Sequence, residues 1–298
     1  MSLRVGRVIA DSSNRRVGCV VVQARPVSEL RRDWRLIEDA GFHTLWVWDH
    51  LMAYPKMGVL LEAWTTLAAM AMSTSRIRIG PLVANITYRN PAVFAKEAIS
   101  VDHLSGGRLE LGIGAAGTRT DDALVSGVDE WPTRERVERF GEFVEMVSRL
   151  TSGESDSYGG RHYRSDRFAR GPWPVQPRIP LTIAAHGMKT LRIAARHADT
   201  WNVSAGFGRN FDDLIGFLHE NNARLDEFAA AAGREPGSIR RSLLIGASGA
   251  FEWWKSAGAL DEFVGRVGDA GTRDLVFAYP PPAGVDKSTF LELLAPLL

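Results

Sequence analysis

An acid and a histidine stand side by side at the end of a strongly apolar stretch. The tract runs Leu45-Trp-Val-Trp-Asp-His50, so Asp49 and His50 follow residues that suit a buried strand. Neighbouring strand residues point to opposite faces, so one side chain can enter a site while the other braces an adjacent loop. Histidine transfers protons near neutral pH. We therefore take His50 and Asp49 as the candidate catalytic pair, although His50 standing alone would more readily be a surface or capping residue.

A second segment whose residues could bind a ligand joins an apolar run to a stretch with the periodicity of a helix. Its five residues are Ala184, Ala185, His186, Gly187 and Met188. The first amides of a helix have no partner within it, and the helix dipole favours an anion beside them. Lys189 and Arg192 follow, and cations at a helix start oppose the dipole unless an anion is near. We expect a phosphate site here, with solvated surface charges as the alternative.

The elements that must position these residues alternate between short β-branched runs and longer helical stretches, which is typical of repeated βα units. Eight runs have the apolar density of strands buried on both faces. The expected strands are 17–23, 44–48, 77–84, 109–113, 181–185, 200–203, 242–246 and 274–278. The expected helices are 27–40, 60–73, 92–104, 134–151, 189–198, 211–232, 259–270 and 287–297.

Eight alternations at this length predict an α/β protein built as a single (β/α)8 TIM barrel over residues 17–298, after an irregular segment at 1–16. An open doubly wound sheet is the alternative. That fold would carry a glycine fingerprint after its first strand, where this chain reads Ala24-Arg-Pro26. The Gly- and Pro-rich loop 152–179 is longer than is usual inside a compact domain, and either a structural or a functional role is open for it.

Composition narrows the function further. Lys and Arg number 36 against 35 Asp and Glu, so no global field attracts nucleic acid or an anionic membrane, and a small-molecule substrate is expected. The single cysteine, Cys19, lies in an apolar run and reads as a buried strand residue. Neither a membrane span nor a leader is evident, which favours the cytoplasm. The remaining histidines show no metal-ligand spacing, so no metal site is expected.

An ordered series of motifs surrounds the Asp49–His50 pair. It comprises Leu61-Glu-Ala-Trp64, Ser75-Arg-Ile-Arg-Ile-Gly-Pro-Leu-Val83, Arg89-Asn-Pro-Ala92, Leu104-Ser-Gly-Gly-Arg-Leu-Glu-Leu-Gly-Ile-Gly114 and Ile179-Pro-Leu-Thr-Ile-Ala-Ala-His-Gly187. The series resembles the luciferase-like monooxygenase superfamily, and in particular its branch that uses the deazaflavin coenzyme F420. The resemblance covers roughly residues 27 to 205, and the glycine-rich stretch ending at Gly114 is its most specific part.

The resemblance implies where a flavin or deazaflavin would bind. The family carries a cis peptide at the position matching Leu82–Val83, in a bulge that supports the ring, and the expected contacts there are Leu82, Val83, Ala84 and Asn85. Gly112 and Gly114 would let the backbone approach the cofactor, with plain barrel geometry as the alternative. Family members place the cofactor phosphate around 184–188.

For the substrate, the resemblance implies two candidate contacts. Tyr54 falls where some relatives place an active-site tryptophan, so it can form an aromatic wall or pack in the core. Thr118 ends the run Ala115-Ala-Gly-Thr118, where some sugar-phosphate dehydrogenases of the branch carry a glutamate. The substrate of those enzymes is therefore not transferred to this chain.

Three functions follow from the resemblance. The favoured one is an F420-dependent oxidoreductase that transfers a hydride between deazaflavin and a small organic substrate. The second is an FMN-dependent monooxygenase, which needs a flavin reductase as a partner. The third is a flavin-binding protein without turnover, and a homodimer is open in each case.

Overall fold

The computed structural model describes residues 15–51, 59–117, 121–152, 157–167, 172–206, 209–246 and 252–298. Among these residues the main sheet has nine strands, all parallel, in the order β3-β2-β1-β11-β10-β9-β8-β5-β4. Its strands are β1 (Val17–Val21), β2 (Thr44–Val47), β3 (Arg78–Pro81), β4 (Ala84–Asn85), β5 (Leu111–Gly114), β8 (Leu181–Ala184), β9 (Thr200–Ser204), β10 (Arg240–Ile245) and β11 (Asp274–Tyr279).

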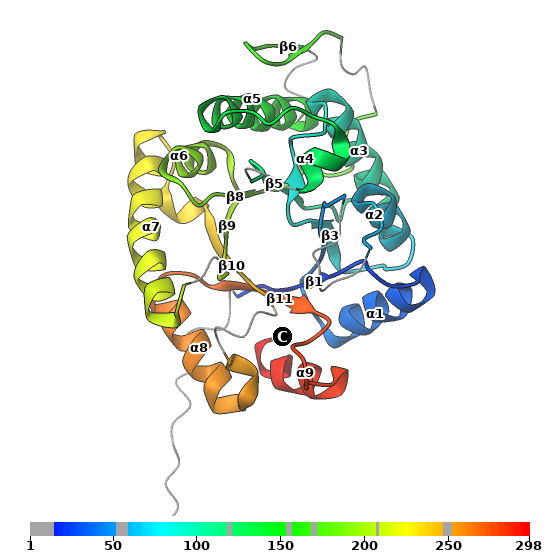
Figure 1. The fold of residues 1–298 in the computed structure, drawn as a ribbon, viewed down its shortest axis with the longest axis vertical. Helices are drawn as coiled ribbons and strands as arrows, with labels where there is room; N and C mark the ends of the chain where they lie inside the picture. Colours follow the sequence, from blue (N-terminus) through cyan, green and yellow to red (C-terminus); the bar gives the residue numbers. More distant parts are fainter. Residues whose placement is uncertain are drawn as a thin grey trace, which may run out of the picture.

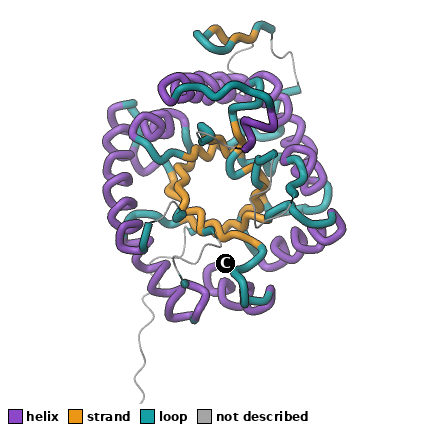
Figure 2. Tube along the Cα trace, in the orientation of Figure 1, coloured by secondary structure: helices purple, strands orange, loops and turns teal. Residues whose placement is uncertain are grey.

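The sheet closes on itself through the third expected strand. β3 and β4 are two parts of that strand, separated by Leu82 and Val83. β4 pairs with β5, and Ile79 of β3 bridges the segment before β5 by accepting from the Glu110 amide at 2.8 Å. With β3 and β4 taken as one, eight strands surround the axis, which confirms the predicted barrel. Figure 2 shows the resulting ring of strands with the helices outside it.

The helices follow the strands around the outside of the barrel (Figure 1). They are α1 (Val27–Ala40), α2 (Ala63–Ala71), α3 (Pro91–Ser105), α4 (Asp121–Ser126), α5 (Thr133–Ser152), α6 (Met188–His197), α7 (Phe211–Ala231), α8 (Ala257–Asp269) and α9 (Lys287–Leu294). All eight expected helices are present within three residues of their expected bounds. The short helix α4 was not expected. No helix of the described residues is long and apolar enough to cross a membrane.

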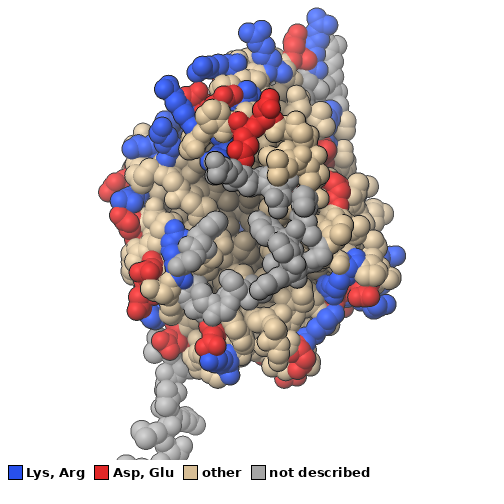
Figure 3. All heavy atoms as spheres, in the orientation of Figure 1, with Lys and Arg blue, Asp and Glu red and all other residues tan. Residues whose placement is uncertain are grey.

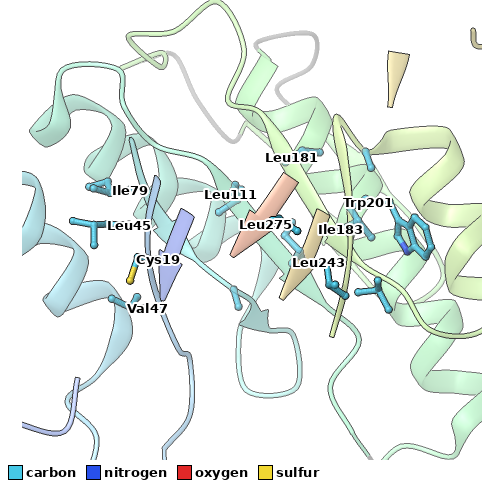
Figure 4. Packing of buried hydrophobic residues seen from close by; sticks show 14 of the residues in the cluster. Cys19, Leu45, Val47, Ile79, Leu111, Leu181, Ile183, Trp201, Leu243 and Leu275 are labelled. Atoms are coloured by element: carbon cyan, nitrogen blue, oxygen red, sulfur yellow. The ribbon is translucent and has the colours of Figure 1, made fainter. Parts of the chain in front are cut away.

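Alternate strand residues build two separate apolar layers. One set packs outward against the helices and forms the main core, ten of whose side chains are labelled in Figure 4. Cys19, Leu45 and Leu243 of this set are each fully buried. Each such side chain contributes about 1.5–3 kcal/mol through removal from water. The other set faces the inside of the barrel, so both faces of the strands are buried, as their composition predicts.

Capping residues fix where α3 begins and ends, and α3 leads away from the third strand. The Asn90 side chain accepts from the amides of Ala92 and Val93, and Pro91 occupies the first turn. Gly106 ends the helix in a left-handed conformation with φ of 66°, which favours glycine. The sequence therefore sets the direction of the chain as it leaves the carboxyl end of the barrel wall.

The long loop is anchored at the amino end of the barrel. Asp102, fully buried near the end of α3, accepts from the amides of Val175 and Gln176 at 2.7 and 3.2 Å. Gln176 also accepts from Arg78 at the start of β3. The segment 172–178 thus packs opposite the carboxyl ends of the strands and has a structural role. Within the same loop, β6 (Tyr158–Gly159) and β7 (Arg164–Ser165) form a hairpin beyond α5.

Candidate functional site

Several predicted site residues meet at the carboxyl ends of the strands. Asp49 lies two residues after β2, Val83 lies between β3 and β4, Gly114 ends β5, and Ala185 directly follows β8. The four residues share the carboxyl end of the barrel, as predicted for them. The space-filling view in Figure 3 is hollowed near its centre, over the ring of strands.

Inward-facing apolar side chains form a floor at this end of the barrel. This floor cluster comprises Val20, Trp46, Leu82, Val276 and Ala278, with Trp48, Val83 and Leu244 partly buried against it. The edge of Trp48 meets His50, with ring centroids 6.2 Å apart. A predicted acid–base residue therefore stands beside an apolar surface that suits a planar ring.

The Leu82–Val83 peptide is cis, as expected. The Leu82 amide donates to the Val47 carbonyl at 2.8 Å, which ties this segment to the end of β2. Leu82 is buried and Val83 is half-buried. The segment has the position that the family resemblance implies for a ring support.

Gly112 and Gly114 are explained by packing within the barrel wall. A Cβ atom on Gly112 would lie 2.1 Å from the Pro81 carbonyl oxygen, and one on Gly114 would lie 2.4 Å from Cγ2 of Val83. Real Cβ contacts are not that short, so both positions require glycine or a displaced neighbour. Both glycines let the third strand approach β5 closely and so set the position of the Leu82–Val83 segment.

Asp49 forms a buried ion pair with Arg89. The Arg89 guanidinium donates Nη2 to Oδ1 at 2.8 Å and Nε to Oδ2 at 3.1 Å, in a two-pronged arrangement. Oδ2 also accepts from the Asn85 amide at 3.0 Å, and the Asp49 backbone carbonyl accepts from the Tyr88 hydroxyl at 2.8 Å. Asp49 therefore braces the loop that follows β4. For two neighbouring residues at the end of a strand we expected one to enter the site and the other to brace a loop, and Asp49 is the second of these.

Arg89 is the centre of a larger charge cluster. Its guanidinium also contacts Glu62 at 3.1 Å and Glu97 at 3.3 Å. Burial opposes its charge, but the hydrogen bonds and charge of Asp49, with the two glutamates, outweigh that effect and raise the pKa of Arg89. Burial raises the pKa of Glu97 above its ordinary value despite the attraction of Arg89. The cluster holds the start of α2 and the second turn of α3 against the loop after β2.

His50 has a carboxylate partner that sequence reasoning missed. Its Nδ1 lies 2.6 Å from Oδ2 of Asp122, a buried residue of α4, while His50 itself is partly exposed. Asp49 does not fill this role, because its two oxygens accept from Arg89 and from the Asn85 amide. Asp122 lies in a six-residue helix, which is too short to show a helical periodicity in the sequence. The sequence shows only that an acidic residue follows β5, and nothing in it indicates a contact with His50.

The β8–α6 connection retains the features expected of an anion site. Gly187 precedes α6, and no side chain caps the amides of the first turn. Trp201 donates its indole Nε1–H to the Ala185 carbonyl at 2.9 Å, which holds the backbone at the end of β8. Desolvation by surrounding protein, with a smaller effect of the Arg209 guanidinium, lowers the pKa of His186 to about 4. The His186 side chain itself is exposed to solvent.

The cations near this connection differ in their surroundings. The guanidinium carbon of Arg192 lies 3.9 Å from the centre of the Phe228 ring, and that of Arg209 lies 4.0 Å from the centre of the Phe217 ring, so both cations stack on aromatic rings of α7. Lys189 is exposed in the first turn of α6. Nη1 of Arg209 is buried and has no hydrogen-bond partner among the described residues. A cation that sequence reasoning missed therefore lies near the predicted phosphate site.

The two predicted substrate contacts cannot be placed. Tyr54 and Thr118 both lie outside the described residues.

Comparison with known proteins places these features in a family. The model of the luciferase-like monooxygenases matches residues 12–248. The F420-dependent hydroxymycolic acid dehydrogenase of Mycobacterium tuberculosis is 32% identical over 239 residues, which are 76% of this chain and 62% of that protein. The 5,10-methylenetetrahydromethanopterin reductase of Archaeoglobus fulgidus is 32% identical over 184 residues, or 62% of this chain and 51% of that protein. The chain thus spans less than two thirds of the length of these two relatives.

A solved structure has the same fold over nearly the whole chain. It is an F420-dependent secondary alcohol dehydrogenase in complex with an F420–acetone adduct, with a TM-score of 0.76 at 19% identity. The similarity covers 95% of this chain and 98% of that one. Together with the match over residues 12–248, the barrel and the cis Leu82–Val83 segment at its carboxyl end, these findings establish that the chain belongs to the luciferase-like monooxygenase family.

Proposed function

We propose that this protein is an F420-dependent oxidoreductase that transfers a hydride between the deazaflavin and an alcohol/carbonyl pair. The observation that carries the proposal is a partly exposed histidine, His50, held by a buried carboxylate beside the apolar floor cluster. The named activities of the relatives support the cofactor. Two of those names describe enzymes of hydroxy compounds, which supports the substrate class.

The residues of the floor suit a deazaflavin ring. Leu82 and Val83 present apolar side chains from the barrel wall, and Trp48 supplies an aromatic surface. Ala84 and Asn85 are both buried, and the Asn85 amide is occupied by Asp49, which keeps this strand in place. We assign Leu82, Val83, Ala84 and Asn85 to the ring, with Gly112 and Gly114 acting through the position of Val83.

The β8–α6 connection suits the cofactor phosphate. The uncapped first turn of α6 offers amide hydrogens together with the positive end of the helix dipole. The buried Nη1 of Arg209, which has no hydrogen-bond partner among the residues described, supplies an orphaned cationic donor. We assign Met188 to the phosphate through its backbone amide, flanked by Ala184, Ala185 and His186, and Gly187 to the turn that presents it, because the Gly187 amide donates to Oγ1 of Thr190 at 3.2 Å.

When bound, F420 supplies a ring carbon that accepts or returns a hydride and reacts poorly with oxygen, so the protein supplies position and proton transfer. For an alcohol to be oxidised, its hydroxyl would have to lose a proton as the carbinol carbon gives up a hydride. His50 takes that proton on its Nε2, because Nδ1 faces Asp122. Carbonyl reduction runs the same steps backwards, with His50 giving the proton to oxygen. Asp49 acts indirectly, by holding Arg89 and the Asn85 amide.

The acid–base role of His50 predicts a separation of binding from chemistry. His50→Ala should leave F420 binding within a few-fold and reduce turnover by about 10²–10⁴, the usual contribution of a positioned acid–base group. Fluorescence titration measures binding, and single-turnover absorbance of the deazaflavin with a panel of secondary alcohols measures chemistry.

A matched variant controls for the loss of an imidazole. His103→Ala changes a histidine at the far end of α3, where its Nε2 bonds the Trp173 carbonyl, and should leave both quantities unchanged. Weakened F420 binding with unchanged turnover of the saturated enzyme would remove His50 from the proton-transfer step.

A further inference from the structure

Asp122 makes two hydrogen bonds to the end of the loop that follows β2. Its Oδ2 lies 2.6 Å from Nδ1 of His50, and its Oδ1 accepts from the Leu51 amide at 2.7 Å. The carboxylate reaches across 72 positions in the chain to do so. One oxygen therefore holds the imidazole ring, and the other holds the backbone that carries it.

Burial distinguishes the two members of this pair. The Asp122 side chain is 6% exposed and the His50 side chain is 30% exposed. An exposed ion pair of long side chains contributes little, but a 2.6 Å hydrogen bond between an imidazole and a buried carboxyl group orients the ring. The buried member is thus the support, and the exposed member is the one that a substrate can reach.

The other acidic residue beside the imidazole cannot give this support. Both oxygens of Asp49 accept from Arg89 or from the Asn85 amide. The 6.2 Å edge contact with Trp48 limits where the ring can lie but does not choose which nitrogen carries the proton. That choice depends on the hydrogen bond at Nδ1.

We propose that Asp122 is the positioning residue of the catalytic histidine. It keeps the proton of neutral His50 on Nδ1, so that Nε2 is left as the nitrogen that accepts the substrate's hydroxyl proton, and its charge then stabilises the imidazolium that forms. The logic is that of the aspartate in a serine-protease triad, which holds its histidine in the correct tautomer and is not itself protonated. The inference rests on the proposed role of His50 in proton transfer.

Asp122→Asn tests the tautomer with little change in shape. The amide keeps an oxygen for the Leu51 amide and can turn its NH2 group toward Nδ1, which then has to be the acceptor. Two-bond ¹H–¹⁵N spectra of histidine-labelled full-length protein with F420 bound, at a pH where His50 is neutral, report the tautomer directly. His50→Gln identifies the His50 signals. Wild type should show the proton on Nδ1, and Asp122→Asn should show it on Nε2.

The turnover of the same variant completes the test. With F420 and whichever secondary alcohol wild type oxidises, for example 2-propanol or cyclohexanol, Asp122→Asn should lose about 10²–10⁴ in single-turnover rate while F420 binds within a few-fold. Glu138→Gln is the matched control, because it removes a carboxylate that faces another histidine, His162, at 3.6 Å and outside the site. It should change neither the His50 signals nor the rate.

Asp122→Ala covers the case in which Asp122→Asn does not fold, and it too should remove the preference for Nδ1. A proton that stays on Nδ1 in both variants overturns the proposal, as does a shifted tautomer with a wild-type rate. The outcome for the proposed function is separate. A wild-type protein that binds F420 and oxidises none of the alcohols contradicts the substrate class alone, and His50→Ala with full turnover contradicts the role of His50.

Discussion

Replacing either of two glycines of β5 with alanine should destabilise the protein, but by different amounts. The added Cβ would meet a fixed backbone atom at one position and a movable side-chain atom at the other. A Cβ on Gly112 would meet the Pro81 carbonyl oxygen at 2.1 Å, whereas a Cβ on Gly114 would meet Cγ2 of Val83 at 2.4 Å. Ordinary contact begins near 3.4 Å, so the neighbouring atom must retreat by about 1 Å or more in each case. In the first it belongs to the backbone of the barrel wall, and in the second it ends a side chain.

The costs should differ accordingly. Gly112→Ala forces a strand out of register with its neighbours, and we expect it to lower the free energy of unfolding by at least about 3 kcal/mol, the upper end for overpacking. Gly114→Ala can be absorbed by turning Val83 away from its preferred rotamer, at about 0.5–1.5 kcal/mol. The displaced Val83 changes the surface assigned to the deazaflavin ring, so this variant should bind F420 at least about tenfold more weakly.

Urea unfolding followed by tryptophan fluorescence measures both costs, and titration measures F420 binding to the folded variants. Gly216→Ala in α7 is the control, because a Cβ there meets nothing within 4 Å. It should stabilise the protein by about 0.5–1 kcal/mol, the usual gain from alanine within a helix. A Gly112→Ala variant as stable as wild type, or a larger loss in Gly114→Ala than in Gly112→Ala, would refute the reasoning.

Two further predictions concern charge. Arg89→Met leaves Asp49 buried without its partner and should destabilise the protein by about 3–5 kcal/mol in urea unfolding, with part of the loss restored by Asp49→Asn; a loss under about 1 kcal/mol would contradict this. Desolvation and nearby guanidinium groups lower the pKa of His43 to about 4, so only the unfolded chain is protonated between about pH 4 and 6.5. Stability should therefore rise with pH across that window. His43→Asn should flatten the slope between about pH 4 and 6.5, and an unchanged slope would exclude His43 as its source.

The barrel could be predicted because its signals are local. α1 has the expected bounds, since Pro26 precedes it and Gly41 ends it in a left-handed conformation. Strands buried on both faces show as continuous apolar runs, and their alternation with helical stretches counts the βα units. The position of Asp49 and His50 follows from the same pattern, because a residue just after a strand lies at the carboxyl end of the barrel.

The partners of these side chains could not be predicted. Asp122 meets His50 only once the chain after β5 has turned back over the barrel, and no spacing in the sequence encodes that contact. Gly112 and Gly114 signal a close approach, but sequence cannot say whether a cofactor or a neighbouring strand approaches them. The structure identifies the neighbour as the third strand. Likewise, the acceptor role of Asp102 toward the long loop depends on contacts more than 70 positions apart.

The choice of cofactor is tested most directly by equilibrium binding. Full-length protein should be titrated with oxidised F420 and, separately, with FMN, with the change in fluorescence as the readout. The floor cluster, the β8–α6 connection and the orphaned Nη1 of Arg209 predict one F420 per chain, bound at least about tenfold more tightly than FMN. Saturable binding of FMN that is tighter than that of F420, or no binding of F420, would contradict the proposed function.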